Sequence, residues 1–197
     1  MNKKIIITGF EPFGTDKINP SWEMIRDFKS DKNEIIKMCL PVVFGKASEI
    51  LIEKIKEEKP DVVVMFGQAG GRKKITPERV AINFRDCTIK DNEGNKPQDK
   101  YIIKNAPAAY FSTLPIKKIC RMLKNNFIPS GISNSAGTYV CNDLMYNILN
   151  YIETENLKIK AGFIHVPYIR EQVFNSENFF MELDILKKAA VLIADSF

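Results

Sequence analysis

The first candidate for chemistry in this chain of 197 residues is its only histidine, His165. The apolar residues 162–164 precede it, so we expect His165 at the end of a buried strand. A single histidine excludes any metal site that needs two or three imidazole ligands. Two interpretations stay open: a hydrogen-bonded histidine of the core, or a general base.

Cys141 is the candidate nucleophile because of the segment before it. Residues 133–138 are small and polar, which is typical of a tight turn, and an amphipathic helix over 141–153 begins at or just before the cysteine. A helix N-terminus favours a thiolate, and its free N–H groups can stabilise an oxyanion. The alternative is a cysteine that packs as a small apolar residue, which suits Cys39 and Cys120 better.

Glu78 is the third candidate, a charged residue with apolar neighbours in the segment 76–83. Its neighbour Arg79 offers a simple alternative, an ion pair on the protein surface. Spacing and local physics therefore indicate a cysteine–histidine pair but do not by themselves assign a role to Glu78.

The elements that must position these residues alternate between strands and helices. We expect strands over 4–10, 34–43, 61–66, 80–89, 128–134 and 161–166, and helices that start at Asn19-Pro20 and Pro115 or cover 47–59, 141–153 and 178–194. This alternation predicts an α/β fold with helices on both faces of a largely parallel sheet. In such folds sites form outside the carboxyl ends of the strands. No linker or repeat divides the chain, so we expect one domain over 1–197.

Composition narrows the class of protein further. The net charge is +5, and the basic residues form scattered pairs without the dense basic stripe that nucleic-acid binding needs. No stretch approaches the roughly 18 apolar residues of a membrane span, and Lys3 and Lys4 lead into too short an apolar run for a signal peptide. The four cysteines form no C-x-x-C pair, which favours free thiols in a reducing cytoplasm over a zinc site.

Six segments in order along nearly the whole chain resemble the type I pyroglutamyl peptidases, also called pyrrolidone-carboxylate peptidases. They are Thr8-Gly9-Phe10-Glu11-Pro12-Phe13-Gly14 with Asn19-Pro20-Ser21, Gly67-Gln68-Ala69-Gly70-Gly71-Arg72, Pro77-Glu78-Arg79-Val80-Ala81-Ile82-Asn83, Asp91-Asn92-Glu93-Gly94-Asn95, Ser135-Ala136-Gly137-Thr138-Tyr139-Val140-Cys141-Asn142 and His165-Val166-Pro167-Tyr168. Six such segments in register are a specific signal, whereas one alone would be weak.

The resemblance implies a single three-layer α/β/α domain with a mixed sheet, and a catalytic triad of Glu78, Cys141 and His165. The implied activity is that of a cysteine exopeptidase, or omega peptidase. It hydrolyses the amide bond after an N-terminal pyroglutamyl residue through a thioester acyl-enzyme. The implied partners are pyroglutamylated peptides and further copies of the chain, as a homotetramer or dimer, with no metal and no organic cofactor.

The resemblance also implies a pocket for the neutral lactam of pyroglutamate. Phe10 and Phe13 would supply apolar walls, Val140 would add to them, and Gln68 and Asn19 would bind the lactam amide or the substrate backbone. Plain core packing is the alternative for both phenylalanines.

One departure from the family pattern affects the expected activity. Thr88 stands where family members often carry an arginine that helps to stabilise the oxyanion, and Arg85 is a candidate to reach the same space. A second interpretation is therefore a weakly active or inactive relative that binds pyroglutamyl peptides or pyroglutamate. A third, another thiol-dependent amidase, would be favoured if Phe10 and Phe13 turned away from Cys141.

Overall fold

A computed structural model describes residues 2–173 and 178–197 and contains a central five-stranded sheet of order β2-β1-β3-β7-β4. Strands β1 (Lys4–Phe10), β2 (Glu34–Leu40), β3 (Val62–Gln68) and β7 (Lys160–Val166) are parallel, and the short β4 (Thr76–Pro77) runs antiparallel to β7. The predicted mixed, largely parallel sheet is confirmed. All seven residues of β3 are buried, as expected for a strand that helices cover on both faces.

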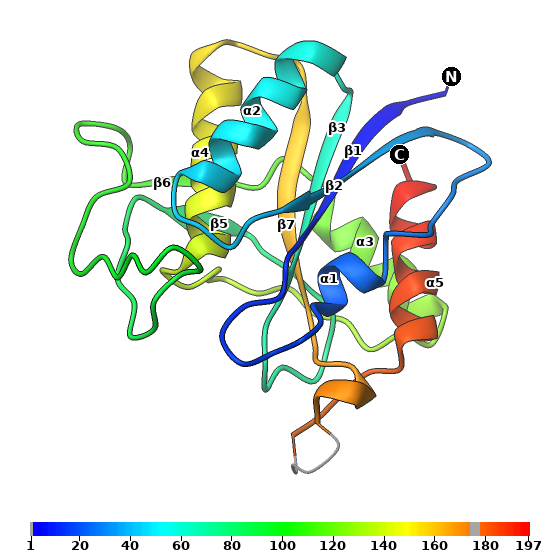
Figure 1. The fold of residues 1–197 in the computed structure, drawn as a ribbon. Helices are drawn as coiled ribbons and strands as arrows, with labels where there is room; N and C mark the ends of the chain where they lie inside the picture. Colours follow the sequence, from blue (N-terminus) through cyan, green and yellow to red (C-terminus); the bar gives the residue numbers. More distant parts are fainter. Residues whose placement is uncertain (1, 174–177) are drawn as a thin grey trace.

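Helices cover both faces of this sheet and make three layers (Figure 1). Helices α2 (Lys46–Glu58) and α4 (Val140–Thr154) lie on one face, and α1 (Pro20–Glu23), α3 (Ile116–Asn125) and α5 (Leu183–Ala194) lie on the other. Each face has its own apolar cluster, because consecutive strand residues point to opposite sides of the sheet. The three-layer α/β/α prediction is confirmed.

Three of the predicted elements form with shorter bounds, and a fourth, described below, does not form. Strand 34–43 ends at Leu40, before Pro41, and strand 80–89 shrinks to β5 (Val80–Ile82), which pairs with an unpredicted strand β6 (Ala109–Phe111). The last helix begins at Leu183 instead of 178, because the N–H of Met181 bonds the carbonyl oxygen of Tyr168 at 2.8 Å. A one-turn 3₁₀ helix, η1 (Arg170–Gln172), lies between β7 and α5.

The prediction of a strand over 128–134 is wrong, since this segment makes only isolated bridges, Ile75 with Ser130 and Glu78 with Ser133. Pro77 of the neighbouring segment has no N–H to donate, so the four backbone bonds between this segment and residues 75–79 form an incomplete parallel pair. The segment nevertheless fixes the backbone on both sides of Glu78.

The sheet brings the ends of two strands together at one edge. In the register of β3 and β7, Gly67 pairs with His165 and Gln68 with Val166, at the carboxyl ends of both strands. Among the described residues, no helix is both long and apolar enough to cross a membrane.

Candidate active site

Glu78 and His165 form a buried hydrogen-bonded pair. His165 lies one residue before the end of β7, and its Nδ1 is 2.7 Å from Oε1 of Glu78. The Glu78 side chain is fully buried, and its backbone N–H donates to the carbonyl oxygen of Phe163 at 2.8 Å, which holds the loop after β4 against β7. Because a carboxylate can only accept, Nδ1 carries the proton and Nε2 is the basic nitrogen of the neutral ring.

Cys141 is the second residue of α4, close to the predicted helix start. The N-cap residue Tyr139 makes no side-chain capping bond, so no side chain competes there for the first-turn N–H groups. A Cβ built on Gly67 would lie 3.0 Å from the Cys141 sulfur and 2.5 Å from the Phe163 ring. The sulfur therefore sits over the β3–β7 strand pair, directly above the residue that pairs with His165.

Arg72 is a site residue to which the sequence analysis gave no role, although it ends one of the six segments. Its Nη1 is 2.6 Å from Oε1 of Glu78, the same oxygen that bonds His165. The guanidinium also donates to the hydroxyl of Thr76 and to the carbonyl oxygen of Ser135. Only the tertiary structure reveals the contact between Arg72 and Glu78, because nothing in the spacing of residues 72 and 78 singles out the pair.

Burial and charge set the protonation of the resting site. Burial raises the pKa of the Cys141 thiol to about 12, the charge of Glu78 raises it too, and that of Arg72 opposes both. Burial lowers the pKa of His165 more than its bond to Glu78 raises it. Burial also acts to raise the pKa of Glu78, but the contacts with His165 and Arg72 outweigh it and the pKa is lowered. The resting site thus holds a neutral thiol, a neutral imidazole and a carboxylate.

The predicted apolar pocket residues lie around Cys141. Phe10 is buried and packs on Phe163, with ring centroids 6.3 Å apart, and Phe163 in turn contacts the His165 ring at 4.8 Å. Phe13 is half-buried against Tyr139, with centroids 6.1 Å apart, and Val140 is buried at the start of α4. Both phenylalanines therefore contact immediate neighbours of the candidate catalytic residues.

The two predicted polar pocket residues differ in how they are held. Gln68 bonds Asp16 at 2.7 Å and Gln172 at 2.8 Å, a cluster that the sequence analysis did not find because its members are far apart in the chain. Asn19 caps α1: its Oδ1 accepts from Ser21, and its Nδ2 donates to the carbonyl oxygen of Glu11. Nδ2 of Asn19 thus holds the loop after β1, which carries Phe13, and Oδ1 holds Ser21, whose hydroxyl accepts from the Phe10 N–H at 3.0 Å.

Arg85 does not bind at the Glu78–His165 pair in this structure. Its Nε is 2.6 Å from Oδ1 of Asp143, a fully buried residue of α4, and its guanidinium lies over the Phe44 ring at 5.7 Å. Thr88 is exposed.

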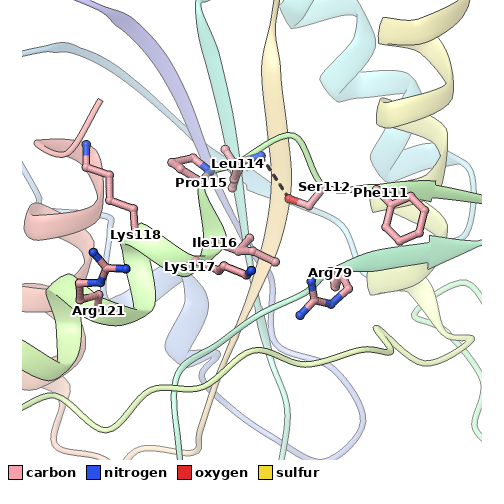
Figure 2. Close-up of a pocket in the computed structure, with 9 residues that line it drawn as sticks. All are labelled: Arg79, Phe111, Ser112, Leu114, Pro115, Ile116, Lys117, Lys118 and Arg121. Atoms are coloured by element: carbon pink, nitrogen blue, oxygen red, sulfur yellow. Dashed lines mark hydrogen bonds between the residues drawn. The ribbon is translucent and has the colours of Figure 1, made fainter.

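A separate cavity of about 540 Å³ is basic and contains none of the predicted site residues. Figure 2 shows Arg79 at one end and the first turns of α3, with Lys117, Lys118 and Arg121, at the other. The Arg79 Nε binds Asn134 at 2.7 Å, so the ion pair between Arg79 and Glu78 that the sequence left open is not formed.

Fold and site together define a cysteine hydrolase: a thiol at a helix N-terminus beside a histidine that a buried carboxylate orients. A family model described as pyroglutamyl peptidase matches residues 3–194. The chain is 51% identical over 193 residues to a pyrrolidone-carboxylate peptidase of Brachyspira hyodysenteriae, covering 96% of both chains. The chain belongs to the pyroglutamyl peptidase family.

Solved structures agree with this assignment. The chain superimposes on the crystal structure of pyroglutamyl peptidase I from Bacillus amyloliquefaciens with a TM-score of 0.96 and 43% identity, covering 98% of this chain and 94% of that one. It matches a mutant pyrrolidone carboxyl peptidase from Pyrococcus furiosus with a TM-score of 0.92 and 43% identity, covering 96% and 95%.

Proposed function

We propose that this protein is an active cysteine exopeptidase that removes an N-terminal pyroglutamyl residue from peptides, with Cys141 as nucleophile, His165 as base and Glu78 as the group that orients the base. One observation carries the proposal: the 2.7 Å bond between His165 and Glu78 lies beside a thiol at the start of a helix. Family membership supplies the substrate class.

The neutral resting site favours a mechanism in which proton transfer accompanies attack. His165 Nε2 takes the thiol proton as the sulfur bonds to the pyroglutamyl carbonyl carbon, and Glu78 stabilises the imidazolium that forms. Free N–H groups at the start of α4 stabilise the oxyanion. The imidazolium then protonates the leaving amine, and water, deprotonated by His165, hydrolyses the thioester and releases pyroglutamate.

Substrate choice would depend on the pocket described above. Phe10, Phe13 and Val140 offer apolar surface to a lactam that carries no charge, and Gln68 offers an amide held by Asp16 and Gln172. Asn19 contributes by fixing the loop that carries Phe13 and the Ser21 hydroxyl that bonds the backbone of Phe10. The position of both rings argues against an unrelated thiol amidase.

Thr88 is the one feature that favours a binding protein without turnover. It is exposed, whereas Glu78 and His165 are buried. The intact pair and the family of peptidases favour turnover. From the four free cysteines we also infer a cytoplasmic location. From the family resemblance we infer one domain over 1–197 and assembly as a homotetramer or dimer. Light scattering measures the assembly directly.

The activity is tested by release of a fluorophore from a pyroglutamyl amide, before and after treatment with iodoacetamide. We expect release by the wild type, and a loss of at least about a thousandfold in Cys141→Ser. Cys39→Ser is the matched control, because Cys39 is an exposed free cysteine on β2. Release that persists after iodoacetamide and in Cys141→Ser would exclude Cys141 as the nucleophile. Saturable binding of pyroglutamate without release would identify a binding protein.

A further inference from the structure

Arg72 and His165 bond the same carboxylate oxygen of Glu78. The Glu78 Oε1 atom accepts from both residues, at 2.6 Å from Arg72 Nη1 and 2.7 Å from His165 Nδ1. The carboxylate has no exposed surface and the arginine side chain retains 28% of its own. A charge-assisted bond of this length, to a buried carboxylate, strongly restricts where that carboxylate can lie.

The rest of the guanidinium is anchored to two other segments. It donates to the Thr76 hydroxyl on β4 and, at 3.2 Å, to the carbonyl oxygen of Ser135, in the turn that leads into α4 and Cys141. Arg72 therefore links the loop after β3, the strand before Glu78 and the turn before the nucleophile. The positive φ of Gly71, +80°, gives the backbone the bend from which Arg72 points back into the site.

We propose that Arg72 is a positioning residue that holds Glu78 and the turn before Cys141 in register, and whose charge fixes the ionisation of the site. This inference rests on the proposed function. It assigns no contact between Arg72 and substrate, and it makes the active unit a cluster of four residues instead of three.

The charge of Arg72 acts in one direction on both reacting groups. It lowers the pKa of His165 and of Cys141, and Glu78 acts on both in the opposite sense. A hydrogen bond from the Ser133 side chain also lowers the pKa of Glu78, and the backbone N–H of Cys141 lowers the pKa of its own thiol. Removing the charge of Arg72 should therefore raise the pKa of His165 and of Cys141 together.

The test compares Arg72→Met with Arg72→Lys and with Arg79→Met. Arg79 is the matched control, because it follows Glu78 in the sequence but binds Asn134 and lines the basic cavity of Figure 2. In Arg72→Met we expect kcat to fall roughly 10- to 100-fold, as for other residues that orient a functional group. Both limbs of the pH profile of kcat/KM should move to higher pH, and Arg79→Met should leave both in place.

Arg72→Lys separates position from charge. It keeps the charge but has no planar guanidinium to reach Thr76, Glu78 and Ser135 at once, so kcat should fall while the limbs stay close to those of the wild type. If Arg72→Met fails to fold, Arg72→Lys still tests the positioning role. Wild-type kcat in the lysine variant, or unmoved limbs in a folded methionine variant, would overturn the proposal.

The rate of Cys141 alkylation by iodoacetamide gives a second measurement that needs no substrate. Peptide mass spectrometry separates Cys141 from the other three free cysteines. At a fixed pH near neutrality we expect slower alkylation in Arg72→Met than in the wild type and in Arg79→Met. This result would support the role of Arg72 even if the wild type released no pyroglutamate, and equal rates in all three proteins would contradict it.

Discussion

Two buried carboxylates of this structure, Glu78 and Asp143, are each bonded to an arginine. Arg72 binds Glu78 at 2.6 Å, and Arg85 binds Asp143 at 2.5 Å; both carboxylates are fully buried, and the arginines keep 28% and 23% of their side-chain surface. By distance and burial the two pairs are nearly the same. They differ in the second group that donates a hydrogen bond to the carboxylate.

Besides its arginine, Glu78 binds the imidazole of His165, whereas Asp143 accepts from the backbone N–H of Gly45, at 2.8 Å. Arg85 also exchanges backbone hydrogen bonds with Lys100, so its pair joins α4 to the start of α2 and to the long loop before β6. We infer that the Arg72–Glu78 pair belongs to the proposed catalytic site, because Glu78 bonds the imidazole that changes its protonation in the proposed mechanism. The Arg85–Asp143 pair contacts no such group in the described part of the chain and acts as a structural connection.

The largest contrast should come from neutralising each carboxylate. Glu78→Gln keeps the shape but cannot stabilise the imidazolium, and we expect kcat to fall on the order of a thousandfold or more. Asp143→Asn should change kcat of the folded enzyme far less. Rates on the pyroglutamyl amide, corrected for the folded fraction, measure both. A similar loss in the two variants would remove the distinction between the pairs.

The next contrast is in stability. Among the residues that the structure describes, Arg85→Met leaves the buried Asp143 carboxylate with only the Gly45 N–H as a hydrogen-bond partner, so we expect the free energy of unfolding to fall by about 3 kcal/mol. The pH limbs of kcat/KM should not move, unlike those of Arg72→Met. Urea denaturation and a pH profile of the same preparation are sufficient. A shifted profile in Arg85→Met would mean that Arg85 also acts on the catalytic groups.

The acid limb of the pH profile should show which carboxylate governs His165. Burial lowers the pKa of His165 from 6.5, so the wild-type limb should lie below pH 6.5. Glu78 acts to raise this pKa, and its replacement by glutamine should move the limb to still lower pH. Asp143→Asn should leave the limb unchanged. An opposite shift in Glu78→Gln would contradict the assignment of Glu78 as the partner of His165.

The smallest expected effect is on stability against pH. His165 is the only histidine, and its pKa is lowered in the folded state, so the unfolded chain binds the additional proton. The free energy of unfolding should therefore fall as the pH drops from about 6.5 towards the folded pKa of His165. Glu78, whose pKa is lowered from 4.5, should contribute only below that value. His165→Asn is the control: it should lose the upper transition alone.

Local sequence was a good guide to the elements with a strong apolar pattern. The isoleucines of β1, the valines of β3 and the amphipathic residues of α4 each produced the observed element within a few residues. Segment 128–134 was also expected to form a strand, yet Pro77 in the neighbouring segment has no N–H to donate and the pairing with residues 75–79 stays incomplete. Pairing depends on the partner chain, which a local pattern does not contain.

The sequence by itself determined the α/β fold, the family and the candidate residues Glu78, Cys141 and His165, because residue types and short motifs carry that information locally. Only the tertiary structure decided that Arg72 shares an oxygen of Glu78 with His165, that Arg85 binds Asp143, and that Gln68 binds Asp16 and Gln172. Hydrogen bonds and charges act over a few ångströms in space. Distances of that size between distant segments exist only once the sheet has set their register.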